Sequence, residues 1–419
     1  MRNRRLSLSL LVSLAISGPF HAQQWMVYDM DNSPLPSVTV KALAPDGAGG
    51  LWVGTDWGLC HFDGTSDWTV YQQGTSPLID NNIQCLGLDG AGRLWIGTVS
   101  MGLQVKDGEE WTTYTPMNSE LPEFGVRDLF IDPEDGVWTC TSEGLARFDG
   151  VGWIHYNATP ESHDGAVLNT SNTNTVAVRE DGTICLGTFN GGLHFIQGDQ
   201  VEVLTSFDDG FFDNTAVDVA FHPLTGARWV ATPAAGLLRQ QGPVVGGLWT
   251  QWNAAAGFPS NATTALAIDP DGDVWVGTQI AGLVRVHADG GFDQFTTVGS
   301  SIPDDWIRSI LADPDGVIWV GTGLGGLARF DPTVGVQQLT RSSFLRVHPN
   351  PGRDRLFLDV QGANDGSSWQ LVSADGRLVK QGGAFLGTTT IELLGLSPGT
   401  YILQVHLGDF VETERVIVE

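Results

Sequence analysis

The sequence predicts an all-β protein: a seven-bladed β-propeller over residues 23–340, followed by a small C-terminal β-sandwich over residues 341–419. Three observations lead to this prediction. A short motif recurs seven times, Gly-rich turns separate the recurring segments, and the residues after 340 continue as alternating strands without the motif. A period in the forties built from short apolar strands and tight turns is typical of propeller blades.

The recurring motif is Trp-Val-Gly-Thr or a degenerate copy of it. Its first position falls at residues 52, 95, 138, 185, 229, 275 and 319, in steps of 43, 43, 47, 44, 46 and 44 residues. Because neighbouring blades pack face to face, both faces of each sheet must be apolar, and Trp supplies a large flat contact. We therefore expect the recurring Trp side chains to be structural.

Each repeat contains four expected strands, which the first copy illustrates. Residues 38–44 alternate apolar and polar side chains, as a half-buried strand does. Three further strands follow at residues 51–55, 59–62 and 68–71, separated by turns that are rich in Asp and Gly. The same order of strands and turns returns in the later copies.

The pattern of the fourth strand, Trp-x-x-Tyr, occurs once more at residues 25–28, before the first full repeat. A ring of blades must protect its two open edges. We expect residues 25–28 to form the outer edge of the last blade and so to close the ring. Residues 336–339 would then be displaced, pair as an extra edge strand, or lead into the next domain, and the sequence leaves these alternatives open.

Composition excludes one class of partner. The formal net charge is −27, and only three of the 419 residues are Lys. Such a surface repels phosphate backbones, so we expect no nucleic-acid partner.

Residues 1–22 combine a basic start with a short apolar run, as a signal peptide does, and we expect no membrane span after its removal. An exported chain permits disulfides. The four Cys residues, at positions 60, 85, 140 and 185, all fall on expected strands, however. We therefore favour buried thiols and leave their pairing open.

The blade pattern resembles a known repeat. It reads Asp-Gly-x-x-Trp-Val-Gly-Thr, Gly-Leu-x-x-Phe-Asp-Gly, Trp-x-x-Tyr and Asn-Ser-x-Leu-Pro, and residues 135–149 and 271–286 carry it well. This pattern is similar to the two-component-regulator propeller repeat over residues 24–340. The resemblance implies a seven-bladed propeller of the kind used as the sensing module of membrane-bound hybrid histidine kinases. No kinase or receiver segment follows here, so we expect no signalling through such parts.

The C-terminal segment carries three motifs in order: Pro-Asn-Pro at 349–351, Asp-Gly-Arg-Leu-Val at 375–379 and Leu-Ser-Pro-Gly-Thr-Tyr-Ile-Leu at 396–403. Alternating strands with Gly or Pro in the turns predict a small antiparallel sandwich. Together the motifs resemble the type A sorting domain of the type IX secretion system. The resemblance implies a secreted or outer-membrane surface location, with the type IX secretion machinery as the partner of this domain.

No catalytic constellation stands out. The nine His residues are scattered, and neither a nucleophile elbow nor a phosphate-binding loop is present. Residues 269–273 are superficially similar to a calcium loop, but they lack its terminal Glu and coincide with a blade turn. We therefore predict no catalytic residue, no metal site and no cofactor.

We expect the function to lie on one rim of the propeller, where the loops joining second to third strands and one blade to the next emerge. Aromatic or polar residues outside the repeat pattern are the candidate ligand-binding residues: Asp56, Trp57, Glu143, Asn190, Phe211, Phe212 and Trp306. Aromatic rings beside carboxylates suit a sugar or an extended peptide, although loop anchors that pack locally have the same composition.

These features favour a secreted or cell-surface protein that binds a glycan, peptide or surface polymer without catalysis. The alternatives are a lyase or hydrolase acting on polysaccharide, with rim carboxylates as acid and base, and a surface adhesion protein.

Overall fold

The computed structural model describes residues 24–206, 211–244, 247–332, 345–348, 352–360, 367–373, 377–383, 388–407 and 410–418. The expected signal peptide at residues 1–22 and the segment 336–339 lie outside these residues. The chain divides into two compact units, Met1–Gly335 and Val336–Glu419. No helix within the described ranges is long and apolar enough to cross a membrane.

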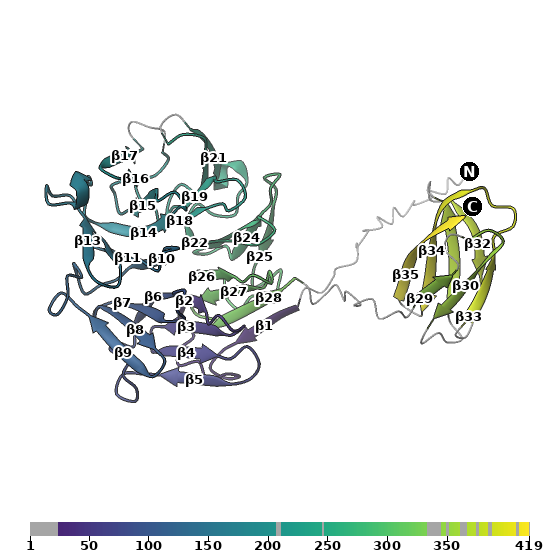
Figure 1. Cartoon of the computed structure of the whole chain (residues 1–419), viewed down its shortest axis with the longest axis horizontal. Helices are drawn as coiled ribbons and strands as arrows, with labels where there is room; N and C mark the ends of the chain where they lie inside the picture. Colours follow the sequence, from purple (N-terminus) through teal and green to yellow (C-terminus); the bar gives the residue numbers. More distant parts are fainter. Residues whose placement is uncertain are drawn as a thin grey trace, which may run out of the picture. The chain divides into compact units, whose positions relative to one another are not determined.

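The first unit contains seven four-stranded antiparallel sheets, arranged around a centre as the blades of a propeller (Figure 1). Six blades take their strands in chain order, from the innermost to the outermost. The innermost strands of these six are β2 (Val40–Pro45), β6 (Ile83–Leu88), β10 (Asp128–Ile131), β14 (Thr173–Val178), β18 (Asp218–Phe221) and β22 (Thr263–Ile268). The predicted all-β propeller class is confirmed.

The remaining strands of these six blades follow in groups of three. They are β3 (Leu51–Thr55), β4 (Leu59–Phe62), β5 (Trp68–Tyr71), β7 (Leu94–Thr98), β8 (Leu103–Asp107), β9 (Glu110–Tyr114), β11 (Val137–Thr141), β12 (Gly144–Phe148), β13 (Trp153–Tyr156), β15 (Ile184–Thr188), β16 (Leu193–Gln197), β17 (Gln200–Leu204), β19 (Arg228–Ala231), β20 (Leu237–Gln241), β21 (Leu248–Trp252), β23 (Val274–Thr278), β24 (Leu283–Val286) and β25 (Phe292–Phe295). Two single-turn 3₁₀ helices, η1 (His163–Gly165) and η2 (Ala254–Ala256), lie in the connections between blades.

The N-terminal strand completes the last blade. This blade contains β26 (Ile307–Ala312), β27 (Ile318–Thr322) and β28 (Leu327–Asp331), and β1 (Gln24–Tyr28) pairs antiparallel with β28 at its outer edge (Figure 1). Each innermost strand contacts the innermost strand of the next blade, and β26 contacts β2, so the ring is closed. The prediction for residues 25–28 is correct.

The Trp side chains of the repeat are buried between blades, and Trp275 illustrates their contacts. It is 1% exposed and packs against Phe295 and Phe330, with ring centroids 5.6 and 5.4 Å apart. Its Nε1 donates a hydrogen bond to Asp269 at 2.9 Å, and Arg285 of the facing strand stacks over the ring at 5.3 Å. The segment at 269–273 is thus a blade turn, as expected, with Asp269 fixing the Trp side chain.

Trp229 offers a control for a test of this hydrogen bond. Its side chain is buried like that of Trp275, but its Nε1 has no hydrogen-bond partner in the described part of the chain. Trp275→Phe leaves the Asp269 carboxylate without one of its donors, and we expect it to lower the free energy of unfolding by about 2 to 3 kcal/mol. Trp229→Phe leaves a similar cavity but removes an unpaired donor, so its cost is expected to be smaller by about 1 kcal/mol or more. Urea unfolding of both variants measures the difference. Equal losses would contradict the role given to the indole–carboxylate bond.

The second unit is a two-layer sandwich. One sheet contains β29 (Leu345–His348), β30 (Arg355–Val360) and β33 (Thr388–Glu392), and the other contains β32 (Leu378–Gly382), β31 (Ser368–Ser373), β34 (Gly399–Leu407) and β35 (Phe410–Val418). Buried side chains of both sheets share one core, with Leu358 from the first sheet and Trp369 and Leu403 from the second. The alternating pattern of the sequence predicts this architecture correctly.

All four Cys side chains are buried free thiols in the propeller, as expected. Burial raises the pKa of Cys60 and of Cys185 to about 12. These thiols therefore stay protonated and behave as small apolar side chains.

Candidate functional site

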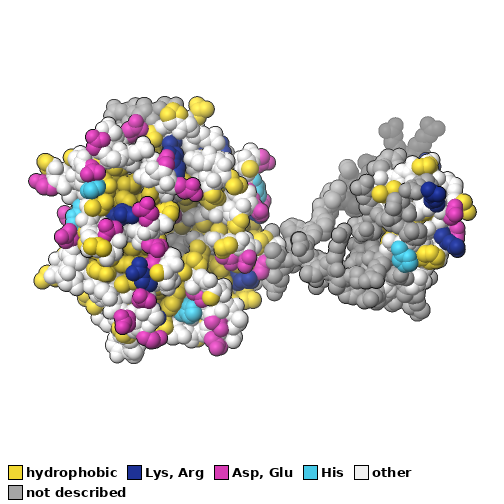
Figure 2. All heavy atoms as spheres, viewed as in Figure 1, with side chains coloured by type: hydrophobic (Ala, Val, Ile, Leu, Met, Phe, Trp, Pro, Cys, Tyr) yellow, Lys and Arg dark blue, Asp and Glu magenta, His cyan; other side chains and the backbone are white. Residues whose placement is uncertain are grey.

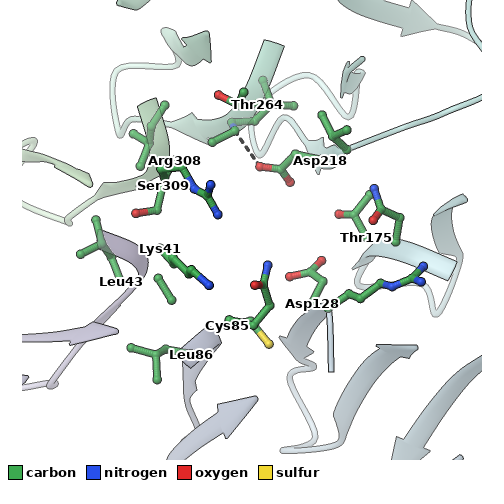
Figure 3. Close-up of a pocket in the computed structure, with 18 residues that line it drawn as sticks. Lys41, Leu43, Cys85, Leu86, Asp128, Thr175, Asp218, Thr264, Arg308 and Ser309 are labelled. Carbon is green, nitrogen blue, oxygen red and sulfur yellow. Dashed lines mark hydrogen bonds between the residues drawn. The ribbon is translucent and has the colours of Figure 1, made fainter. Parts of the chain in front are cut away.

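The seven innermost strands surround a cavity of about 510 Å³ at the centre of the propeller (Figure 3). Every blade contributes residues to its lining. The volume is in the range of pockets that hold small ligands or a short stretch of a polymer.

One residue at the same place in each blade lines this cavity, and we call the set the channel ring. Its members are Lys41, Gln84, Arg127, Asn174, Val217, Thr264 and Arg308. In five blades the pairing register shifts across this residue, as in the step from Val40 to Ala42 on β2. A bulge leaves the extra residue outside the ladder and redirects its side chain. Five of the seven residues therefore stand outside the ladder, whereas the N–H groups of Arg127 and Val217 donate to the carbonyls of Cys140 and Ala231 on the neighbouring strand.

The channel ring also holds three basic residues. Residues 24–332 contain eleven Lys and Arg side chains. Eight of them lie outside the channel ring, and each of these stacks on an aromatic ring: Arg93, Lys106, Arg147, Arg179, Arg228, Arg239, Arg285 and Arg329. The other three are Lys41, Arg127 and Arg308, and none of these forms an ion pair within 4.0 Å among the residues described. On the face drawn in Figure 2, by contrast, Asp and Glu side chains are scattered over the blades.

The partners of these three cations are neutral. Lys41 Nζ donates to Asn82 Oδ1 at 2.5 Å, and Arg127 donates to Asn172 and to the Thr173 carbonyl. The Arg308 guanidinium lies 5.0 Å from the ring centroid of Trp306. Their positive charges therefore remain uncompensated by direct contact.

Lys41 and Arg308 belong to adjacent blades and influence each other. Burial lowers the pKa of Lys41, and the charge of Arg308 lowers it further. Burial also lowers the pKa of Arg308, while Asp56 acts in the opposite direction on both groups. The Oδ1 atom of Asp56 is buried and accepts no hydrogen bond from any described residue. This corner of the channel thus combines two repelling cations with an unused acceptor.

Two carboxylates, Asp128 and Asp218, project into the channel from the side opposite Lys41 (Figure 3). Asp128 accepts a hydrogen bond from the Val176 N–H at 3.0 Å, and Asp218 accepts one from the Leu266 N–H at 2.7 Å. Each bond joins one blade to the innermost strand of the next. Burial raises the pKa of Asp128 to about 6 and that of Asp218 to about 8, and the Asp128 charge adds to the second shift.

The seven residues that were proposed on the basis of the sequence lie in different parts of the structure. Trp306 lines a cavity together with Arg308, and Asp56 acts on the charges of Lys41 and Arg308. Trp57 follows Asp56 in the same turn, with 62% of its surface exposed.

None of the seven proposed residues lines the central cavity. Glu143, Asn190 and Phe212 are exposed in loops. Phe211 is buried and packs on Trp249 with a centroid distance of 5.5 Å, so it is a loop anchor.

Sequence reasoning missed the channel ring, although a signal for it exists. The ring residue lies 11 positions before the repeat's Trp position in six copies and 12 before it in the fifth. At this spacing the residue type changes from copy to copy, whereas the positions beside it stay mostly apolar or small. A variable, mostly polar position inside an otherwise regular strand therefore identifies the residue that lines the channel.

Two family models match the chain. The two component regulator propeller model matches residues 34–57, 77–100, 257–279 and 301–323, and the secretion system C-terminal sorting domain model matches residues 346–419. No curated protein sequence matches.

Several solved structures share the fold. One is the extracellular domain of the hybrid two-component system BT3049 from B. thetaiotaomicron, at 19% identity and a TM-score of 0.64, covering 94% of this chain and 57% of that one. PorZ, a surface component of the type IX secretion system of Porphyromonas gingivalis, is 17% identical with a TM-score of 0.57, covering 90% and 59%. YCF48 from Cyanidioschyzon merolae is 14% identical with a TM-score of 0.54, covering 74% and 98%.

The present chain therefore spans less than two thirds of the first two of these structures, and at such identities the likeness concerns the fold. The C-terminal sorting domain indicates export to the cell surface or the medium. The chain carries two-component regulator propeller repeats followed by a C-terminal sorting domain of the type IX secretion system.

Proposed function

We propose that the propeller is a non-enzymatic binding domain that takes an extracellular polymer at the channel ring. The channel ring itself is the observation that supports this proposal. Seven equivalent residues line one cavity, five of them at bulges in the strand pairing, and three of them are cations without an ion pair among the described residues. Variable polar groups on a rigid, repetitive scaffold are the usual composition of a binding site.

The geometry favours binding over catalysis. An acid–base mechanism needs a carboxyl group within reach of a substrate proton. Asp128 and Asp218 are instead engaged by backbone N–H donors of the next blade. Lys41 and Arg127 are held by neutral side-chain and backbone acceptors. The groups that face the cavity are therefore arranged to hold a ligand.

The location of the site can be tested without knowing the ligand. Val217→Trp places a large side chain in the channel and changes no charge. Val151→Trp is the matched control, because Val151 is 94% exposed in a turn at the outside of its blade. On an array of extracellular polysaccharides and peptides, we expect the wild type and Val151→Trp to retain the same ligands and Val217→Trp to lose them.

Two outcomes would overturn the proposal. Unchanged binding by a folded Val217→Trp variant would place the site elsewhere on the protein. Shortening of a retained polymer during incubation, followed by size-exclusion chromatography, would favour the lyase or hydrolase alternative.

A further inference from the structure

We infer that the channel binds the carboxylate groups of an acidic polysaccharide, with Lys41 and Arg308 as the cations that hold them. The inference rests on the proposed function and adds the chemistry of the ligand. Two features of the corner between the first and last blades support it: the cations without an ion pair and the aromatic rings beside them.

The first feature is the positive charge. Lys41 and Arg308 occupy the same ring position in adjacent blades, and no described carboxylate lies within 4.0 Å of either. Two like charges this close raise each other's free energy, and an anion placed between them removes that cost. Partial exclusion of water by the channel walls strengthens the attraction relative to the open surface. A guanidinium also matches the two oxygens of a carboxylate.

The overall charge makes this corner selective. The chain carries a net charge of −27, so its surface repels acidic polymers at long range. Attraction is confined to the channel, within about one Debye length of the two cations at physiological salt. An acidic chain is therefore expected to bind there and not along the outer blades.

The second feature distinguishes a sugar from other anions. The indole of Trp57 is exposed in the turn that contains Asp56, and the ring of Trp306 lies beneath Arg308. A uronate residue offers a carboxylate and an apolar C–H face in one unit, which together match the two cations and the aromatic rings. An acidic peptide supplies the carboxylate but no comparable apolar ring face.

Isothermal titration of the full exported protein tests the inference with defined probes. The probes are oligomers of galacturonate, of alginate and of hyaluronate, the methyl-esterified galacturonate oligomer as a neutral analogue, and poly-glutamate. We expect at least one acidic oligosaccharide to bind, and its affinity to fall with added salt. Esterification is expected to abolish the binding of a galacturonate oligomer.

Four variants are expected to change the affinity for the acidic probe in different ways. Lys41→Met and Arg308→Met keep most of the aliphatic volume, and each is expected to weaken binding by about tenfold or more, the loss of one charge-assisted hydrogen bond. Lys41→Arg is expected to retain binding. Asp56→Asn keeps an acceptor oxygen but removes the negative charge beside both cations, so it is expected to tighten binding of the acidic probe.

The outcomes separate the two proposals. Equal binding of acidic and neutral oligosaccharides, lost in Val217→Trp but kept in Lys41→Met and Arg308→Met, would overturn the inference and leave the proposed function intact. Binding of poly-glutamate alone would overturn the choice of a polysaccharide. Acidic binding that survives Val217→Trp would overturn both.

Discussion

A chain that lacks residues 24–28 is expected to lose the cooperative unfolding transition of the propeller. The reason is that β1 supplies the outer strand of the last blade and also contacts both neighbouring blades. Trp25 packs against Phe295 of the sixth blade and Phe330 of the seventh, with centroids 5.7 and 4.9 Å apart. Tyr28 lies 5.5 Å from both Phe62 and Trp68 of the first blade.

The expected loss is large compared with the stability of a folded domain. Removal of a fully buried aromatic side chain costs about 3 to 5 kcal/mol, and deletion removes two half-buried ones, Trp25 and Tyr28, together with the strand pairing of β1. A native domain is stable by only about 5 to 15 kcal/mol. Deletion also exposes the edge of β28, which is a template for aggregation. Urea unfolding followed by Trp fluorescence, together with size-exclusion chromatography, measures the effect.

The control keeps the strand and changes an exposed position. Met26→Thr leaves Trp25 and Tyr28 in place, and Met26 is 42% exposed, so a change within about 0.5 kcal/mol is expected. An unfolding midpoint that is the same with and without residues 24–28 would show that the ring does not depend on β1.

The second large effect concerns pH and the channel carboxylates. The pKa of Asp218 is raised from 3.8 to about 8 and that of Asp128 from 3.8 to about 6, with burial as the main cause of both shifts. Between pH 3.8 and pH 8 the native state therefore binds more protons than the unfolded state. The stabilising contribution is complete below pH 3.8 and is lost as the pH rises through 6 and then 8.

Replacement of Asp218 by Asn removes the contribution of Asp218 to the pH dependence of stability, because Asn does not ionise. The Asn amide oxygen can still accept the Leu266 N–H, but no buried charge develops at alkaline pH. We expect Asp218→Asn to raise the free energy of unfolding at pH 9 by a few kcal/mol, since each unit of pKa shift corresponds to about 1.4 kcal/mol. At pH 5 the difference from the wild type is expected to be small. Urea unfolding at both pH values provides the measurement.

Asp149→Asn serves as the control, because the pKa of Asp149 is shifted in the direction opposite to that of Asp218. This residue is exposed, and hydrogen bonds from the Gly152 and Val151 N–H groups lower its pKa, so Asp149→Asn should bring no gain at pH 9. His287, whose raised pKa comes first from its bond to Asp273, contributes a pH dependence of the same sign as Asp218. Comparison of the wild type with Asp218→Asn separates the pH dependence due to Asp218 from that due to His287. A mutant that keeps the wild-type slope between pH 5 and pH 9 would show that Asp218 is ionised throughout.

The repeat made the fold predictable, because each feature of the motif has a role inside one blade or between two. Trp275 fills the space between blades, and Gly277 is required because a Cβ atom there would meet the Ile307 side chain of the next blade. The extra Trp-x-x-Tyr at residues 25–28 identified the closing strand, since every other copy of that pattern among the described residues forms an outer strand.

The site was predictable only in part. The rim was chosen from loops, and among the residues named there Asp56 and Trp306 lie beside the cations of the channel ring. Lys41 and Arg308 were missed because they belong to strands, where sequence reasoning expects side chains to pack. Only the bulge separates them from the ladder, and a bulge is not visible in the hydrophobic pattern.

The bulge also has a consequence for the evolution of such proteins. At a bulged position an exchange costs no ladder bond, and the loss of a side-chain hydrogen bond to the next blade, such as that of Asn174 to the Ala216 carbonyl, costs only about 0.5 to 1.5 kcal/mol. Each of the seven positions comes from its own blade, so duplication and drift of single blades can alter the lining one residue at a time. Transplanting another set of seven side chains onto this framework is therefore a direct route to a receptor with a different preference.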